Sequence, residues 1–384
     1  MDDARPPPRQ APRTGASEDG DAWLALASVA GVGPRTCGAL VRAFGGPAAA
    51  RRASAARLAA VPGVGPARAG ALARGLACAD PAAMRAAAAA VGLAVRTPAD
   101  ADFPRALLEA GDPPPALWVR GAVPTVGDAV AVVGTRAASA YGLRVARATA
   151  EALARAGVVV VSGLARGVDG AAHAGAIAGG GATLAVLGCG ADVVYPPEHV
   201  GLADDVAAHG ALLSEHPPGT PPQPGHFPRR NRIVAALVQA VVVVEAGTTS
   251  GALLTARLAA EAGREVLAVP GPVDRGTHAG CHRLLRDGAT LCEGADDVLR
   301  ALGRGDARGG EARGGGAAAA PADPPPSGPA LVVWNALDPD DVVAPDALAL
   351  RTGLSADAVA AALTQLELTG RAVAVPGVGL RRVR

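Results

Sequence analysis

The sequence contains no lysine, few aromatic residues and few cysteines. All 36 positively charged side chains are arginine, and phenylalanine, tyrosine and tryptophan together make up 2% of the 384 residues. The five cysteines, at positions 37, 78, 189, 281 and 292, form no C-x-x-C pair. This argues against a zinc ribbon and against a disulfide-stapled secreted fold, so we expect reduced cysteines.

Long apolar runs and a strong excess of one charge are also absent. No run approaches the ~18 apolar residues of a membrane span, and the first twenty residues hold no apolar signal-peptide core. We therefore expect a cytoplasmic protein without a membrane segment. The formal net charge is only +1, so any anion site must be a local cluster of arginines.

Two polar segments divide the chain. Residues 1–20, rich in proline and charge, are predicted to be a disordered tail, and residues 303–329, rich in glycine, alanine and proline, a flexible linker. These segments leave a small N-terminal domain over 21–80, a large middle domain over 81–302 and a C-terminal domain over 330–384.

The middle domain alternates between apolar runs and helical patterns. Six short, continuously apolar runs predict buried strands, at 129–134, 158–163, 182–188, 211–215, 240–247 and 265–271. Most are separated by alanine- and arginine-rich stretches with helical spacing, such as Tyr141 to Ala156 and Gly251 to Ala262. This order predicts an α/β fold with a doubly wound, mostly parallel sheet, which binds ligands at the carboxyl ends of its strands.

The N-terminal domain contains Gly-Val-Gly-Pro twice, at Gly31–Pro34 and at Gly63–Pro66, each before a helical pattern. Glycines permit tight turns with exposed amides, and proline favours the first turn of a helix. The pair resembles tandem helix-hairpin-helix motifs, which hold nucleic-acid backbone. Seven arginines against two aspartates between Asp21 and Asp80 favour phosphate contact. Tight helix packing alone is the alternative, and a third copy, "PGVGL" at Pro376 to Leu380, predicts only a β-hairpin.

Polar residues follow several predicted strands. Thr135 and Arg136 follow the first strand, and Ser162, Gly163 and Arg166 follow the second. "HFPRRNRIV" and "EAGTTSGALLTA" follow two later strands. Only Gly134 matches the dinucleotide fingerprint, so we expect no NAD or FAD and no other cofactor. The convergence of arginines, hydroxyls and glycines at one edge of the sheet predicts a binding site.

These segments, in order, resemble the DNA-processing protein A (DprA) family over residues 103–300. The stretches that carry the resemblance are "AVVGTRAASAYG", "VVSGLARGVDGAAHAGAI", "LAVLGCGADVVYPPEH", "LLSEHPPG", "HFPRRNRIVAAL", "VVVVEAGTTSGALLTARLAAEAGREVLAVPG" and "GCHRLLRDGA". His282 stands where an asparagine is common in the family. The resemblance implies a Rossmann-like domain, with a helix-hairpin-helix (SAM-like) domain before it and a winged-helix-like domain after it.

The resemblance also implies a function. It implies a protein that binds single-stranded DNA, forms a homodimer through the Rossmann-like domain and loads RecA recombinase during natural transformation, without enzymatic activity. By position, Arg136 and Arg166 match basic residues of the family's DNA pocket. The other implied DNA-binding residues are Thr135, Ser162, Gly163, Phe227, Arg229, Asn231, Arg232, Ser250 and Gly251. With so few aromatics, affinity should depend mainly on phosphates and therefore on salt.

Two alternative readings remain open. Asp169, Glu215 and Glu245 near strand ends could make a nucleotide-processing enzyme, although capping or pairing with arginine is the simpler role for them. The C-terminal domain, with helices predicted over 346–351 and 355–368 and then a hairpin, could belong to a winged-helix transcriptional regulator. Its five arginines against six acids give no clear duplex-binding face. "HAGCH" at 278–282 lacks a companion at metal-ligand spacing, so we expect no metal.

Overall fold

The computed structural model describes residues 17–124, 127–304, 327–337, 342–369, 371–375 and 379–382. The predicted tail up to residue 16, most of the predicted linker and residues 376–378 of the predicted hairpin lie outside this described part. The chain divides into two compact units, one within Met1–Ala138 and Gly142–Gly305 and the other within Ser139–Tyr141 and Asp306–Arg384.

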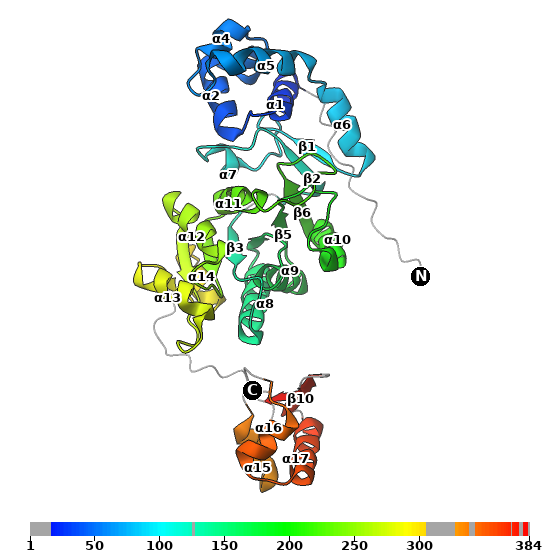
Figure 1. Cartoon of the computed structure of the whole chain (residues 1–384), viewed down its shortest axis with the longest axis vertical. Coiled ribbons are helices and arrows are strands. Elements are labelled where there is room, and N and C mark those ends of the chain that lie inside the picture. The colour runs from blue at the N-terminus through cyan, green and yellow to red at the C-terminus, as the bar shows by residue number, and fades with distance from the viewer. Residues whose placement is uncertain are drawn as a thin grey trace. The chain divides into compact units, whose positions relative to one another are not determined.

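The first unit begins with short helices (Figure 1). They are α1 (Glu18–Ser28), α2 (Pro34–Phe44), α3 (Pro47–Arg51), α4 (Ala55–Ala59), α5 (Gly65–Cys78) and α6 (Pro81–Ala90). Helix α1 starts inside the stretch predicted as a disordered tail, so that boundary is corrected to before Glu18. The reason is a local cap, in which the Ser17 hydroxyl accepts a hydrogen bond from the Gly20 amide at 3.0 Å and acidic residues fill the first turn.

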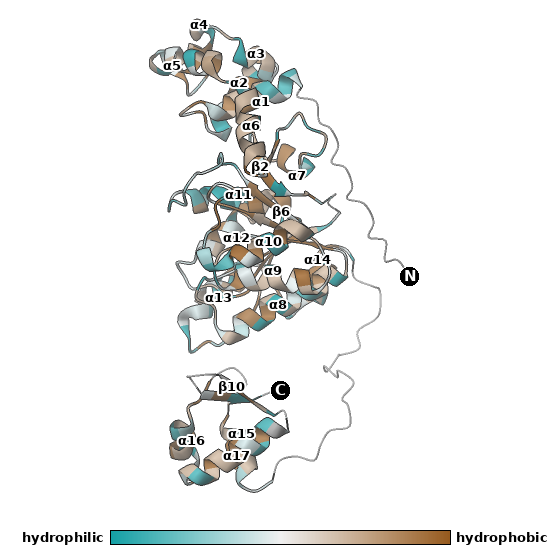
Figure 2. Ribbon diagram, turned by 90° about the vertical axis from the view of Figure 1, so that its right-hand side faces the viewer, coloured by the Kyte–Doolittle hydropathy of each residue, from teal (hydrophilic) through white to brown (hydrophobic). Residues whose placement is uncertain are grey.

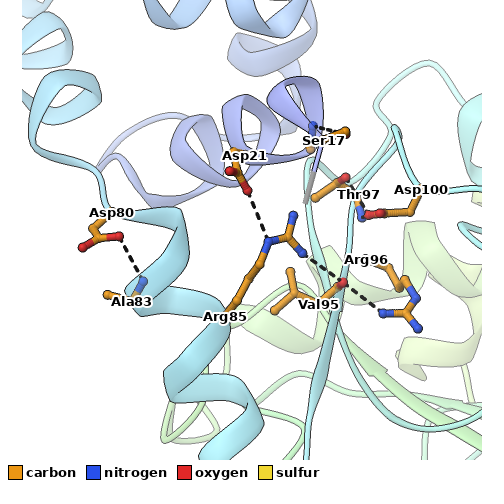
Figure 3. Close-up of polar contacts among 10 residues, drawn as sticks. Ser17, Asp21, Asp80, Ala83, Arg85, Val95, Arg96, Thr97 and Asp100 are labelled. Carbon is orange, nitrogen blue, oxygen red and sulfur yellow. Dashed lines mark hydrogen bonds and ion pairs between the residues drawn. The ribbon is translucent and has the colours of Figure 1, made fainter. Parts of the chain in front are cut away.

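Arg85 joins these helices to the first strand of the sheet (Figure 3). From α6, its Nε donates to the Asp21 carboxylate of α1 at 3.3 Å, and its guanidinium also reaches the carbonyl of Val95 at 3.5 Å. Asp80 caps the start of α6 by accepting from the Ala83 amide at 3.0 Å. Arg85 thus connects α1 and α6 to β1 (Ala94–Arg96), a strand that the apolar runs in the sequence did not predict.

The described residues of this unit form a nine-stranded sheet in the order β1-β2-β6-β5-β4-β3-β7-β8-β9. Strands β3 to β9 run parallel, whereas β2 pairs antiparallel with both β1 and β6. The bounds are β1 (Ala94–Arg96), β2 (Leu117–Gly121), β3 (Ala129–Val133), β4 (Val159–Ser162), β5 (Thr183–Val186), β6 (Gly210–Ser214), β7 (Ala240–Val243), β8 (Glu265–Ala268) and β9 (Thr290–Leu291). The predicted α/β class with a mostly parallel sheet is confirmed, and each of the six predicted runs overlaps a strand.

Helices cover both faces of the sheet. They are α7 (Arg105–Leu108), α8 (Ala140–Arg155), α9 (Val168–Ala178), α10 (Val200–His209), α11 (His226–Leu237), α12 (Gly251–Glu261), α13 (Ala279–Arg286) and α14 (Ala295–Ala301), with 3-10 turns η1 (Pro197–His199) and η2 (Gly276–His278). Alternate residues of the central strands pack on α11 and α12, while residues of β5 and β6 that point the other way pack on α10. Figure 2 shows the sheet around β6 in brown, which fits burial on both faces.

The second unit contains α15 (Pro329–Ala336), α16 (Pro345–Thr352) and α17 (Ala356–Leu368), followed by the antiparallel strands β10 (Ala372–Val375) and β11 (Gly379–Arg382). Ser355 caps α17, because its hydroxyl accepts a hydrogen bond from the Ala358 amide at 3.3 Å. Three helices and a hairpin around one apolar core confirm the winged-helix-like fold. Among the helices described here, none has the length and apolar character needed to cross a bilayer.

Candidate nucleic-acid interface

A cleft of about 680 Å³ opens at the carboxyl ends of the central strands. Strand β3 lies between β4 and β7, and the chain winds outward from β3 in one direction and from β7 in the other. Such a switch point leaves a crevice outside the strand ends, where doubly wound sheets bind their ligands. The volume suits one nucleotide or a similar group.

The turn after β3 forms one wall of the cleft. The Thr135 amide donates to the Glu245 carbonyl at 2.7 Å, and the Thr135 carbonyl accepts from the Val168 amide at 3.3 Å. Gly134 is required here because a Cβ would lie 2.5 Å from the Val168 side chain. The backbone of this turn is therefore fixed, while the side chain of Arg136 is exposed at the cleft.

The turn after β4 forms the floor. The Asp169 carboxylate accepts from the amides of Gly163 and Ala165, at 3.1 and 3.4 Å. Arg230 reaches the same place from α11 and donates to the Val186 carbonyl. Burial raises the pKa of Asp169, and the positive charge of Arg230 opposes that rise. A Cβ on Gly163 would lie 2.2 Å from the Arg230 guanidinium, so this glycine makes room for the buried arginine.

The N-terminal end of α12 forms the opposite wall. The loop from Gly247 to Gly251 lines the cleft, and the Ser250 hydroxyl caps the helix by accepting from the Ala252 amide at 3.4 Å. Asn231 of α11 donates through its side-chain amide to the Gly251 carbonyl at 3.3 Å. A capped helix start with glycines and hydroxyls beside it is a favourable place for a phosphate.

Two aromatic rings complete the cleft. Phe227 of α11 and Tyr195 line it, with 5.6 Å between the ring centroids and 41° between the ring planes. The Arg136 guanidinium carbon lies 4.9 Å from the centroid of the Phe227 ring. A cation on one face of a half-buried ring, next to a second ring, provides both charge and a stacking surface.

Most of the predicted DNA-binding residues therefore line one cleft. These are Thr135, Arg136, Gly163, Phe227, Asn231, Ser250 and Gly251. The other four are not among its lining residues. The Ser162 hydroxyl is fully buried and donates to the Val132 carbonyl at 2.7 Å, a structural role within the sheet.

The remaining three are arginines. Arg232 forms an ion pair with Glu215 and donates to the Asp112 carbonyl at 2.6 Å, so it ties α11 to neighbouring loops. Arg229 is exposed on α11. Arg166 is exposed and forms an ion pair with Glu198.

Arg230 is a charged cleft residue that the predicted DNA-binding set does not contain. It lies in the same "PRRNR" segment as Arg229 and Arg232, and it is only 7% exposed. The signal was the helical period, because Phe227, Arg230, Asn231 and Val234 follow the i, i+3, i+4, i+7 spacing of one helix face. All four line the cleft, whereas the two flanking arginines lie on other faces of α11.

The carboxylates considered for catalysis are held in structural contacts. Asp169 accepts two backbone amides and Glu215 pairs with Arg232. Glu245 is fully buried beneath Gly142, where a Cβ would lie 2.1 Å from its carboxylate. In the part of the chain that the structure describes, no three His, Cys, Asp or Glu side chains gather as a metal site requires.

The two N-terminal hairpins are joined by one side chain. Arg68 donates to the carbonyl of Gly31 at 2.7 Å and to that of Gly63 at 3.0 Å. Both glycines have φ near +80°, a conformation that L side chains rarely adopt. The repeated motif therefore forms the predicted paired hairpins before α2 and within the start of α5. Phosphate contact by these hairpins stays a prediction.

A Rossmann-like sheet with arginine, hydroxyl and glycine at its switch point is of the class that holds phosphate-bearing ligands. Family models agree with each part of the chain. The model described as DNA recombination-mediator protein A matches residues 94–303. A SAM-like helix-hairpin-helix tandem matches residues 24–77, and a DprA winged helix domain matches residues 317–378.

Similar proteins of known sequence or structure agree. A protein Smf from Escherichia coli strain K12 is 42% identical over 292 residues, covering 74% of this chain and 77% of the relative. A DNA processing protein DprA from Bacillus subtilis is 43% identical over 193 residues, covering 50% and 65%. The X-ray structure of DprA from Streptococcus pneumoniae superposes with a TM-score of 0.65 at 31% identity, covering 73% of this chain and 97% of that one.

This chain therefore belongs to the DNA recombination-mediator protein A family. The family resemblance noted in the sequence is confirmed, as is the order of helix-hairpin-helix, Rossmann-like and winged-helix domains. Its place in this family supports a role in DNA processing as a recombination mediator.

Proposed function

We propose that the cleft at the strand ends binds single-stranded DNA and that the protein delivers this DNA to RecA in the cytoplasm during natural transformation. The observation that carries the proposal is the stack of Arg136 on Phe227 at the mouth of the cleft. A phosphate fits the guanidinium and the start of α12, and a base fits the aromatic rings. A duplex keeps its bases stacked inside, so it could use only half of these contacts.

The protein acts in this proposal by binding and not by catalysis. Two observations support that reading: the acids near the strand ends are engaged in buried contacts, and the polar side chains that line the cleft are mainly arginines and hydroxyls. Similarity to a DNA processing protein DprA also supports a role in binding DNA. Incubation of the protein with labelled DNA and with free nucleotides, followed by chromatography of the products, tests this part; turnover of either would overturn it.

The binding proposal is tested by fluorescence anisotropy with a labelled oligo-dT and a duplex of equal length over a salt series. We expect tighter binding of the single strand. We also expect its affinity to fall steeply as the salt concentration rises, because each phosphate contact releases counterions. Equal or tighter binding of the duplex would overturn the proposal and favour the winged-helix regulator. Binding of free nucleotides alone would favour the nucleotide-processing alternative.

The proposed partners need their own tests. Family membership supports RecA loading, which is tested by RecA filament formation on single strands already covered by a single-strand-binding protein; we expect faster nucleation in the presence of this protein. Homodimer formation through the Rossmann-like domain is tested by light scattering across concentration. A monomer at all concentrations would overturn the proposed homodimer, while the proposed binding of DNA in the cleft would stand.

A further inference from the structure

We propose that, in the DNA-free protein, the Glu198 carboxylate is bound to the guanidinium of Arg166. A phosphate of the incoming strand must then displace this carboxylate before it can bind the arginine. The inference rests on the proposed function, because it concerns how the same interface takes up DNA. The inference gives a role to Glu198, which the sequence analysis did not list as a functional residue. It also explains why Arg166, a predicted DNA-binding residue, is found in an ion pair.

The contact has the geometry that a phosphate would use. Arg166 donates from Nε to one oxygen of Glu198 and from its guanidinium NH2 group to the other at 3.1 Å. A two-point contact of a guanidinium with two oxygens is the arrangement in which arginine binds carboxylates and phosphates alike. Glu198 therefore stands where a phosphate group would bind.

The pair lies at the rim of the cleft. Arg166 follows directly after Ala165, which lines the cleft, and Glu198 lies three residues after Tyr195, which also lines it. The side chains of Arg166 and Glu198 are 53% and 49% exposed, so an incoming strand can reach them. The hydrogen bond to Arg166 lowers the pKa of Glu198, so the carboxylate stays charged at neutral pH.

Both partners stand on segments that are held firmly. Leu164 is fully buried although its φ is +57°, a conformation that non-glycine residues rarely adopt, so its packing fixes the turn that carries Arg166. Gly167 follows with φ +74°, and a Cβ there would lie 2.4 Å from the Thr135 carbonyl. On the other side, a ring nitrogen of His199 lies 3.0 Å from the Leu164 carbonyl.

These contacts keep Glu198 within reach of Arg166 without locking the pair. His199 follows Glu198 in η1, and Leu164 lies two residues before Arg166. The contact between the His199 ring and the Leu164 carbonyl therefore holds the segment that carries Glu198 next to the turn that carries Arg166. The ion pair itself is exposed, and exposed ion pairs contribute little to stability because water and salt screen them. The pair can therefore open when a phosphate arrives, while the freed carboxylate stays close and competes.

The competition has a signature in the salt dependence of binding. When a phosphate displaces Glu198 from Arg166, the phosphate releases a cation and the freed carboxylate attracts one, so the exchange adds little to the salt slope. Without the carboxylate, the same contact adds a full single-strand term of about −0.7 to the slope. A change of slope separates displacement from a general gain of affinity.

The test is Glu198→Gln, measured by anisotropy with labelled oligo-dT over a salt series. We expect affinity to rise about three- to fivefold at low salt, since an exposed ion pair is a weak competitor, and the log–log salt slope to steepen by about 0.7. In an Arg166→Gln background the same substitution should change affinity by less than about twofold, because the released arginine is gone.

Glu261→Gln is the matched control. Glu261 is similarly exposed, at 55%, and is also paired with an arginine, but it lies at the far end of α12, about 15 Å along the helix from Gly251, where the helix begins at the cleft. The substitution Glu261→Gln removes the same charge, and it should leave the affinity for oligo-dT and the salt slope nearly unchanged. A gain equal to that of Glu198→Gln would assign the effect to net charge and overturn the inference.

Two failures can be told apart. If the wild-type protein does not bind single-stranded DNA, the proposed function fails. If it binds, and Glu198→Gln changes neither affinity nor slope, or changes them equally in the Arg166→Gln background, then displacement of Glu198 is wrong while the proposed function stands. Circular dichroism of each variant verifies that it remains folded.

Discussion

Arg136 and Phe227 come from elements far apart in sequence, yet the guanidinium carbon of Arg136 lies 4.9 Å from the centre of the Phe227 ring. Arg136 is carried by the turn after β3 and Phe227 by the first turn of α11. The flat ring orients a long side chain that would otherwise move freely in water. The pair thus presents an oriented cation and an aromatic face at one opening.

Reversal of charge in Arg136→Glu should weaken binding of single-stranded DNA at least about tenfold for every sequence tested, since a hydrogen bond to a charged group contributes about 1.5–3 kcal/mol. Anisotropy with oligo-dT and with a mixed sequence measures this. Arg155→Glu, at the other end of α8 and exposed, is the matched charge reversal and should have a small effect. Equal losses in the two variants would mean that only net charge matters.

Phe227 is expected to contribute by stacking. Phe227→Leu should weaken binding of oligo-dT by about 1–2 kcal/mol, because stacking of a base on an aromatic ring is worth about 1–3 kcal/mol. Phe227→Tyr keeps the ring and should retain most of the affinity. If the leucine variant binds as tightly as the wild type, the ring packs in the protein and does not meet a base.

Arg232 is expected to matter for stability and not for DNA binding. Burial raises the pKa of Glu215, and Arg232 opposes that rise. Arg232→Met removes the opposing charge, so the pKa of Glu215 rises further, and the cost of its buried charge is greatest above that pKa. We expect a loss of about 1–3 kcal/mol in the free energy of unfolding at pH 7.5 and a smaller loss at pH 5.

Urea unfolding at the two pH values measures the effect of Arg232→Met. Adding Glu215→Gln should restore much of the stability at pH 7.5, because it removes the unpaired charge. An equal loss at both pH values would instead place the effect in the hydrogen bond from Arg232 to the Asp112 carbonyl.

His216 is expected to make stability depend on pH. Burial, with the charges of His226 and Arg229, lowers the pKa of His216 to about 4, and its ring stacks on that of His226 with 4.1 Å between centroids. The unfolded chain takes up this proton near pH 6.5, so the folded state loses stability as pH falls from about 6.5 to 4. His216→Gln should reduce that loss by ~1 kcal/mol.

Urea unfolding at pH 7 and at pH 4.5 compares His216→Gln with the wild type. His209→Gln, at the exposed end of α10, is the control and should leave the difference between the two pH values unchanged. If His216→Gln also leaves it unchanged, His216 is protonated in the folded protein.

The sequence predicted the parallel part of the sheet because strands buried on both faces are continuously apolar, as in "AVAVV" of β3. It did not predict β1 and β2. Strand β1 has three residues, and β2 ends in Arg120 and Gly121, so neither shows a strong pattern. Both are fixed by pairing across the sheet, which is information that local sequence does not contain.

The candidate site was predictable to the level of segments and not of side chains. Strand ends in a parallel sheet meet at one edge, so Thr135, Gly163 and Ser250 could be brought together from the strand pattern alone. Which arginine of α11 faces the cleft depends on the phase of that helix, and the buried contact of Ser162 depends on the pleat of β4. The partner of Arg166 comes from a turn more than thirty residues away and could not be foreseen.

Photo-crosslinking shows whether single-stranded DNA enters the cleft. A single-stranded oligonucleotide with 5-iododeoxyuridine is irradiated with the full-length protein, and the cross-linked peptides are identified by mass spectrometry. We expect cross-links at Phe227 or Tyr195 in the cleft, and fewer of them in Arg136→Glu. Cross-links confined to the N-terminal hairpins or to the winged-helix domain would contradict it, because DNA would then bind without entering the cleft.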